Sequence, residues 1–397
     1  MVREPRGRFQ ARRRWLVILG CLTALVGAVP ASAQPSSRSE LQEILPPADA
    51  AEFGQSVAIS GQTAVIGNQS SLGTGTGAAY VFVRSRDGWT EQAELLASDG
   101  TSNDSFGWSV AISAATIVVG APFGPNNSGR GAAYVFTRSG TIWTQQAKLT
   151  ASDAANGDEF GFAVGLQRQT LVIGAQLQNN DAGAVYVFQG SGDTWTQTDE
   201  FHGPPLARFG NAVAISGSSF IVGALEANSA TGAAYVYVRS GDTWEEQATL
   251  LASDGAADDQ FGTSVALENG TAVVGAPVKD SSTGAAYVFV RADDIWSQQQ
   301  ELLASDAKED QSFGSAVAVQ GPTMVVGALQ HKDLSGAAYV FASFGQEWSP
   351  TAMLQASDHA VGDRFGTSVA IGGRAVLVGA PYKGPFTAGA AYAFAAP

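Results

Sequence analysis

Short stretches of this chain have the apolar and polar patterns of β-strands, and the first of them, residues 106–112, alternates apolar and small residues. Four such stretches follow one another at residues 106–112, 117–122, 131–136 and 143–149, with turn residues between them. The second is rich in β-branched residues and the fourth is the most polar. No stretch repeats its apolar residues with a sustained helical period. The pattern predicts a four-stranded antiparallel sheet whose strands we name a to d in chain order.

The same unit occurs seven times. A Phe-Gly pair opens each copy, and the pairs begin at residues 53, 106, 160, 209, 261, 313 and 365. A copied unit of this size buries its apolar faces only against its neighbours. Seven four-stranded units predict an all-β, seven-bladed β-propeller that occupies residues 34–397 as a single domain, with the polar strand d outermost.

The two ends of the chain are expected to complete one blade. The seventh copy stops at residues 390–394, inside strand c, and has no strand d. Before the first Phe-Gly pair, residues 43–49 match the end of strand d at residues 94–99. The N-terminal segment should therefore supply the missing outer strand of the last blade, which would leave no unpaired sheet end between the first and last blades.

Residues 1–33 have the pattern of a secretory signal peptide. Six arginines and one acid precede an apolar run of 15 residues, and Ala31-Ser32-Ala33 forms a small-x-small cleavage site. The run is shorter than the ~20 residues that span a bilayer. We expect cleavage near Ala33, no transmembrane segment in the mature chain, and a protein that is secreted, periplasmic or at the cell surface. The arginines also resemble a twin-arginine export signal, and both export routes stay open.

The composition argues against several kinds of site and partner. The only cysteine, Cys21, lies in the leader, so the mature chain would have no disulfide and no thiolate site. The net charge of −14 disfavours nucleic acid as a partner, because an acidic surface repels phosphates. The three histidines lie in different copies, and the chain has no Gly-x-Ser-x-Gly elbow, Walker loop or dinucleotide fingerprint. These features argue against an enzyme.

Carboxylates gather in the d–a loops, which should share one face of the ring with the b–c loops. Five of these loops begin Ala-Ser-Asp and carry a second acid before Phe-Gly: Asp99 and Asp104, Asp153 and Asp158, Asp254 and Asp258, Asp306 and Asp310, Asp358 and Asp363. One interpretation is calcium, which binds several carboxylate and carbonyl oxygens. The other is that aspartate caps turns by accepting hydrogen bonds from backbone N–H groups. The sequence favours the second, because capping explains the repetition without a metal.

The residue after Phe-Gly differs between copies. It is aromatic in two neighbouring copies, as Trp108 and Phe162. Two large rings near the start of strand a, on the loop-bearing face, predict a contact patch for a glycan or peptide. The alternative is that they only pack against their surroundings.

A Phe-Gly pair followed some 13 residues later by Gly-Ala-Pro resembles the FG-GAP repeat. The complete Gly-Ala-Pro occurs at residues 120–122, 275–277 and 379–381. The resemblance covers residues 40–397, and it implies the seven-bladed propeller of integrin α subunits and of bacterial exported proteins. It also implies extracellular binding or adhesion through the loop face. Integrin-type repeats often carry a calcium loop, Asp-x-Asp-x-Asp-Gly, between strands a and b. Here that connection is a tight turn, so the family's calcium site is not carried over.

Together these features predict a non-catalytic binding or adhesion module, expected to be a monomer, that recognises an extracellular protein or glycan through its b–c and d–a loops. Two alternatives stay open. One is a structural scaffold of the cell surface. The other is a glycoside hydrolase or lyase that uses two carboxylates. Because the acids recur with the repeat, the sequence favours a scaffold or binding role over catalysis.

Overall fold

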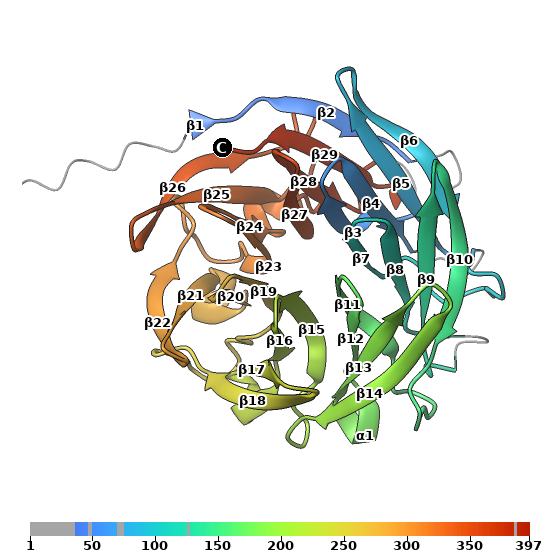
Figure 1. Cartoon of the computed structure of the whole chain (residues 1–397). Coiled ribbons are helices and arrows are strands. Elements are labelled where there is room, and N and C mark those ends of the chain that lie inside the picture. The colour runs from blue at the N-terminus through green and yellow to red at the C-terminus, as the bar shows by residue number, and fades with distance from the viewer. Residues whose placement is uncertain (1–35, 47–49, 70–74, 125–127, 385–386) are drawn as a thin grey trace, which may run out of the picture. The chain divides into compact units, whose positions relative to one another are not determined.

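Seven four-stranded blades form a ring. The computed structural model describes residues 36–46, 50–69, 75–124, 128–384 and 387–397, so the predicted signal peptide lies outside the described residues. In each blade the first strand lies nearest the axis and contacts the first strands of the neighbouring blades (Figure 1). Neighbouring strands within a blade are antiparallel. The predicted all-β, seven-bladed architecture is confirmed.

The blades follow the order of the chain. Blade 1 consists of β3 (Phe53–Ser60), β4 (Thr63–Asn68), β5 (Ala78–Ser85) and β6 (Gly88–Leu95). Blade 2 consists of β7 (Ser109–Ser113), β8 (Thr116–Ala121), β9 (Ala132–Ser139) and β10 (Ile142–Leu149). Blade 3 consists of β11 (Phe160–Gln167), β12 (Thr170–Ala175), β13 (Ala184–Ser191) and β14 (Thr194–His202). Blade 4 consists of β15 (Phe209–Ser216), β16 (Ser219–Ala224), β17 (Ala233–Ser240) and β18 (Thr243–Leu250).

The last three blades continue the series. Blade 5 consists of β19 (Ser264–Glu268), β20 (Thr271–Ala276), β21 (Ala285–Ala292) and β22 (Ile295–Leu302). Blade 6 consists of β23 (Phe313–Gln320), β24 (Thr323–Ala328), β25 (Ala337–Phe344) and β26 (Glu347–Leu354). Blade 7 consists of β27 (Ser368–Gly372), β28 (Ala375–Ala380), β29 (Ala390–Ala395) and the N-terminal strand β2 (Glu40–Ile44).

The N-terminal segment closes the ring as the sequence predicted. Strand β2 runs antiparallel to β29, with Glu43 opposite Tyr392 and Ile44 opposite Ala391. The chain also forms one strand pairing that the sequence did not indicate. Strand β1 (Ser36–Ser37) pairs in parallel with β26, so it adds a short fifth strand to blade 6. The segment from β1 to β2 therefore fastens blades 6 and 7 together (Figure 1).

The apolar core lies between neighbouring blades. Phe160 at the start of blade 3 is fully buried in a cluster that also contains Val135 and Leu149 of blade 2. Its ring meets the rings of Tyr186 and Phe188 at centroid distances of 5.4 and 6.1 Å. Equivalent clusters recur around the ring. Each repeat thus buries its apolar face against the next one, as its period implies.

The glycine of the Phe-Gly pair lets two blades approach closely. Gly107 has φ +96°, and a Cβ atom there would lie 2.2 Å from the carbonyl oxygen of Ala78 in blade 1. Beside it, Phe106 forms an isolated parallel bridge with Gly77. Glycine fits because it has no Cβ and tolerates positive φ. The repeated pair therefore joins one blade to the next.

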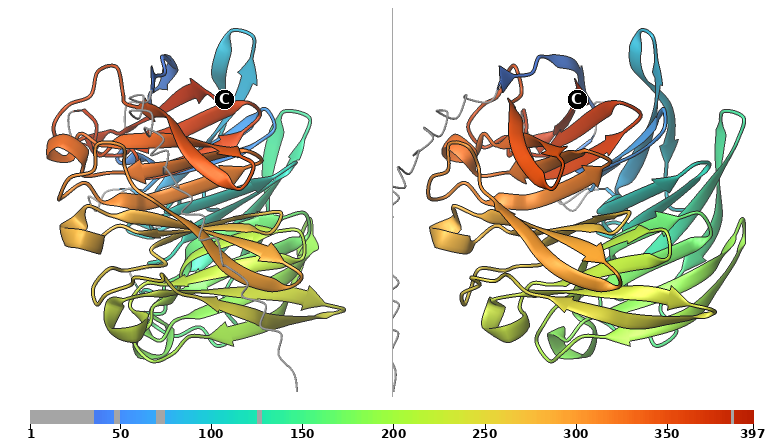
Figure 2. Two further views of the ribbon diagram at one scale, coloured as in Figure 1. Left: turned by 90° about the vertical axis from the view of Figure 1, so that its left-hand side faces the viewer. Right: turned by 60° about the vertical axis from the view of Figure 1, so that its left-hand side comes forward.

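The b–c connections of blades 3 to 6 each contain one short helical turn, and Figure 2 shows these turns on the same side of the ring. They are α1 (Gln178–Asp181), α2 (Ala227–Ala230), α3 (Lys279–Ser282) and α4 (His331–Leu334). Inside each turn two consecutive residues take left-handed values, such as φ 50°, ψ 59° at Asp280. Non-glycine residues rarely adopt this conformation in succession, so the backbone of these four connections is unusual.

Candidate functional site

The first aspartate of each Ala-Ser-Asp loop joins three segments of the loop face. In blade 5 the Tyr287 hydroxyl donates to Asp254 Oδ1 at 2.9 Å, and Lys279 Nζ donates to Asp254 Oδ2 at 2.7 Å. The hydrogen bond from Lys279 holds the pKa of Asp254 below its ordinary value. Burial, aided by the hydrogen bond to Asp254, raises the pKa of Tyr287, so the phenol keeps its proton and remains a donor.

This arrangement recurs in five blades. A strand-c tyrosine donates to the loop aspartate in the pairs Tyr134–Asp99, Tyr186–Asp153, Tyr287–Asp254, Tyr339–Asp306 and Tyr392–Asp358. The second partner varies: it is Lys148, Gln178, Lys279, His331 or Lys383 in the same order. These aspartates, which the sequence offered as calcium ligands, are thus hydrogen-bonded to protein groups from the next blade.

The second acid of the loop caps a turn. Asp104, Asp158 and Asp363 each accept a hydrogen bond from the backbone N–H three residues earlier, at 2.7, 2.6 and 2.7 Å. Their geometric role agrees with the capping interpretation.

Two of the proposed second acids do not occupy this position. The cap two residues before Phe-Gly is Asp259 in blade 5, 2.8 Å from Ala256 N, and Gln311 in blade 6, 3.1 Å from Lys308 N. Asp258 and Asp310 precede the caps at positive φ of 70° and 60°. The sequence analysis therefore placed the cap one residue too early in these two loops. The position is set by its distance from Phe-Gly and not by the first available acid.

Among the described residues, no three His, Cys, Asp or Glu side chains come together in a group that could hold a metal ion. The fit to calcium is poor at the Ala-Ser-Asp loops, because the first aspartate of each loop already accepts hydrogen bonds from a tyrosine and from a cationic, imidazole or amide donor. Asp104, Asp158 and Asp363 already accept from backbone N–H groups. Calcium at these loops stays a prediction.

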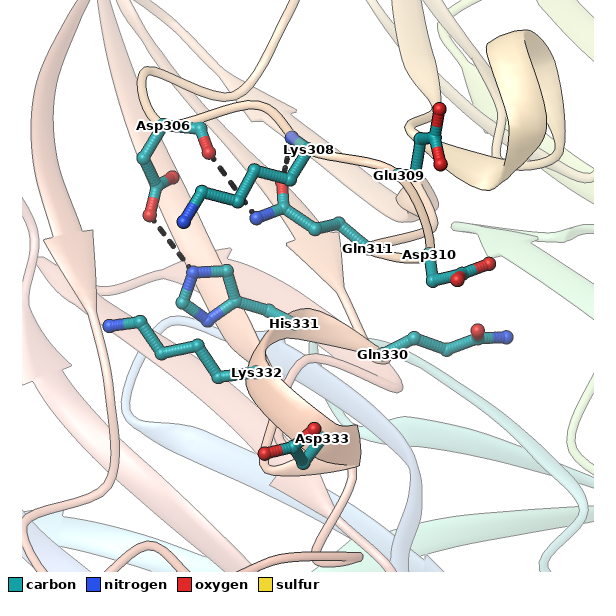
Figure 3. Close-up of a pocket in the computed structure, with 9 residues that line it drawn as sticks. All are labelled: Asp306, Lys308, Glu309, Asp310, Gln311, Gln330, His331, Lys332 and Asp333. Carbon is teal, nitrogen blue, oxygen red and sulfur yellow. Dashed lines mark hydrogen bonds and ion pairs between the residues drawn. The ribbon is translucent and has the colours of Figure 1, made fainter.

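A pocket of about 320 Å³ lies on the loop face of blade 6, between the d–a loop and α4 (Figure 3). It is lined by Asp306, Lys308, Glu309, Asp310, Gln311, Gln330, His331, Lys332 and Asp333. The His331 ring is fully buried, with Nε2 3.0 Å from Asp306 Oδ2. Sequence analysis treated this histidine as isolated. Its spacing was the available signal, because His331, Lys279 and Lys383 all lie 25 residues after their aspartates.

The two predicted aromatic residues touch each other and a third ring. Trp108 and Phe162 have ring centroids 5.1 Å apart, and Trp108 and Phe123 have centroids 5.5 Å apart. All three side chains are half-buried. Phe123 follows β8 in the b–c connection of blade 2, and the sequence analysis did not single it out. We call these three residues the aromatic cluster.

The comparisons with known proteins fit this architecture. The FG-GAP repeat model matches residues 43–82, 89–136, 143–188, 203–237, 244–289, 296–341 and 348–394, which is more than half of the chain. The chain belongs to the FG-GAP repeat family. No curated protein matches it. Each FG-GAP match starts at or near strand d of one blade and ends in strand c of the next, as residues 244–289 do between β18 and β21. The sequence repeat is therefore offset from the blade: each repeat contributes the outer strand of one blade and the three inner strands of the next. This offset links neighbouring blades around the ring.

No helix in the described part of the chain combines the length and the apolar character that crossing a membrane requires.

Proposed function

We propose that this FG-GAP propeller is an exported, non-catalytic binding or adhesion module that recognises an extracellular protein or glycan through its b–c and d–a loops. Cleavage near Ala33 would release the mature chain to the outside of the cytoplasm. The observation that carries the proposal is the aromatic cluster, in which three half-buried rings from two neighbouring blades meet on the loop face.

The aromatic cluster suits a binding role because it departs from the repeat. The position of Trp108 is occupied by Thr263 in blade 5 and by Thr367 in blade 7, so the fold does not require a ring there. Aromatic rings offer large apolar area at low entropic cost and stack well on sugar faces and on peptide side chains. Differences between copies on a common scaffold are where repeat proteins bind their partners.

The enzyme alternative would need two carboxylates of unlike pKa in one pocket. Burial, together with the charge of Asp254, raises the pKa of Glu301, and burial and Asp153 do the same for Glu200. Such pairs resemble the acid and base of a glycosidase. These carboxylate pairs recur in different blades, however, each beside the equivalent strand-c tyrosine, Tyr287 or Tyr186. This repetition favours a structural role for them.

A glycan and protein array probed with the purified protein tests the proposal. We expect specific hits whose affinity falls about tenfold or more in Trp108→Thr, since an aromatic anchor contributes a kcal/mol or more. Phe344→Ala is the control, because Phe344 is an exposed ring (67%) at a c–d turn on the opposite face. Hits that bind Trp108→Thr as well as the parent would refute the aromatic cluster as the site. An array without hits would favour the structural scaffold.

A further inference from the structure

A second pocket lies on the face of the ring that carries the a–b turns. The aromatic cluster lies on the opposite face, at the b–c and d–a loops. The second pocket has a volume of about 340 Å³ and lies between blades 3 and 4. It is lined by Gln167, Arg168, Gln169, Thr170, Gln189, Gly217 and Arg239. The lining therefore includes two arginines and three glutamines, and none of these seven residues carries a carboxylate.

Positive charge without acid is unusual for this chain, whose net charge is −14. Neither guanidinium forms an ion pair with a carboxylate of the described residues. Within the described part of the chain, the side chain of Arg239 forms one hydrogen bond, from Nε to the Gly241 carbonyl, 3.1 Å away in its own turn. Both Arg168 and Arg239 thus keep donors for an anion, which guanidinium groups bind with paired hydrogen bonds.

Blade 3 departs from the repeat at this pocket. Arg168 occupies the first position of the a–b turn at φ 54°. Four other blades place a glycine at that position, also at positive φ: Gly61, Gly217, Gly321 and Gly373. Blades 2 and 5 have Ala114 and Asn269 there, at φ 54° and 46°, so Arg168 is the one charged side chain at this position. A side chain at positive φ strains the backbone, and such strain concentrates at functional positions. The turn would form more easily with glycine, so the arginine is not there to make the turn.

Gln189 is a second departure. Its counterparts, opposite the first residue of strand b in blades 1, 2, 4, 5 and 6, are Val83, Thr137, Val238, Val290 and Ala342. Gln189 Nε2 lies 3.0 Å from Thr170 Oγ1 and Gln189 Oε1 lies 3.2 Å from the same hydroxyl, so Thr170 orients the amide at the pocket wall. A mainly apolar position in the repeat has thus become a polar, oriented group beside the exceptional arginine.

We propose that this pocket binds an acidic sugar unit, with Arg168 and Arg239 holding the carboxylate and the glutamine amides holding the hydroxyls. A guanidinium pair accounts for the anion. Amides both donate and accept, which matches sugar hydroxyls better than a bare inorganic anion that only accepts. The volume is at the lower end of the range for small-ligand pockets, a size that suits one sugar unit. The site is independent of the proposed function on the loop face.

Calorimetric titration with glucuronate, glucose and sulfate tests the proposal. We expect saturable binding of glucuronate, weaker binding of glucose and of sulfate, and a loss of about tenfold or more in Arg168→Gly, because a charge-assisted hydrogen bond disappears. This variant takes the residue of four other blades, so it should fold. Arg291→Ala, the blade 5 counterpart of Arg239, and Trp108→Thr should bind glucuronate normally.

Each other outcome overturns part or all of the proposal. If glucuronate does not bind saturably, or binds Arg168→Gly unchanged, the pocket is not the site. If glucose binds as well as glucuronate, the arginines do not select an anion. If sulfate binds as well as glucuronate, the pocket takes anions and not sugars.

Discussion

At the scale of single residues, Asp254 shows how one carboxylate can hold neighbouring blades together. It lies in the loop that leaves blade 4, and its two donors, Tyr287 and Lys279, belong to blade 5. The side chain of Lys279 is only 8% exposed, whereas that of Asp254 is 45% exposed. Among the described residues, removing the aspartate would leave the buried ammonium group with only the more distant carboxylate of Asp280, 3.9 Å away, and this loss is costlier than losing an exposed pair.

Asp254→Asn should lower the free energy of unfolding by about 1 kcal/mol near neutral pH, a value kept small because solvent screens the half-exposed carboxylate. The hydrogen bond from Lys279 lowers the pKa of Asp254 from its ordinary value of 3.8. The stabilisation is therefore complete above that ordinary value and is lost as the pH falls through the lowered one. Urea unfolding of both proteins from about pH 7 to about pH 2 measures this.

The expected result is a difference between parent and variant that is constant near neutral pH and disappears at the acid end. Asp153→Asn is the matched control, because its second donor is the neutral amide of Gln178 and no ammonium group loses its partner. A difference for Asp254→Asn that stays the same at low pH would contradict the ion-pair interpretation.

The sequence predicted these aspartates as a set but not their partners. Tyr287 follows Asp254 by 33 residues and Lys279 follows it by 25, so their meeting depends on the path of the chain between blades. The same separations recur for Asp306. These partners could have been found by asking which residues lie at the same separation from the loop aspartate in several copies. The spacing of acids within one loop, which indicates metal ligands, does not point to them.

At the scale of elements, the d–a loop depends on a single cap. In blade 5 the cap is Asp259, which is 7% exposed and accepts the Ala256 N–H at 2.8 Å. We expect Asp259→Ala to lower the free energy of unfolding by about 1 kcal/mol, because the Ala256 N–H loses its acceptor in a part-buried hydrogen bond. Chemical denaturation measures the change.

Asp258→Asn is the control for this cap. Asn tolerates the positive φ of residue 258, and no hydrogen bond of the Asp258 side chain is recorded among the described residues, so the change should be close to zero. If instead the substitution at residue 258 destabilised the protein and the one at residue 259 did not, the cap would be at the position that the sequence analysis chose.

Element boundaries could be predicted to within a few residues, and the exceptions have physical causes. The stretch that begins at Phe106 predicts a strand there, but β7 begins at Ser109, because Phe106 does not pair with strand b as Phe160 pairs with Ala175 in blade 3. Strand β1 consists of two serines and has no apolar pattern to detect. The turns α1 to α4 are four residues long with left-handed interiors, so they show no helical period.

At the scale of the whole molecule, the ring was the most predictable feature, because the repeat period and the two complementary chain ends define it jointly. The aromatic cluster was partly predictable. Trp108 and Phe162 departed visibly from the repeat, but Phe123 comes from a variable loop and joins them only in three dimensions. The period of the repeat predicts the scaffold that all copies share. It does not predict which of the residues that differ between copies come into contact in the folded chain.

The stability of the ring should depend on the N-terminal strand β2 that closes it. Ile44 of β2 is 3% exposed and lies in one apolar cluster with Phe53 and Trp89 of blade 1 and Leu377 of blade 7. Without β2, strand β29 would become an unpaired edge and this cluster would be open to water. Loss of β1 alone should matter much less, because it pairs only two residues with β26.

The most direct test of the closed ring is thermal unfolding of a chain that starts at residue 51, compared with one that starts at residue 34. A chain that starts at residue 39 keeps β2 but lacks β1, and it serves as the control. We predict that the shortest chain unfolds at a midpoint lower by about 5 °C or more, that the control stays close to the parent, and that a peptide of residues 36–46 partly restores the midpoint. Equal midpoints for the shortest chain and the parent would contradict closure by the N-terminal strand.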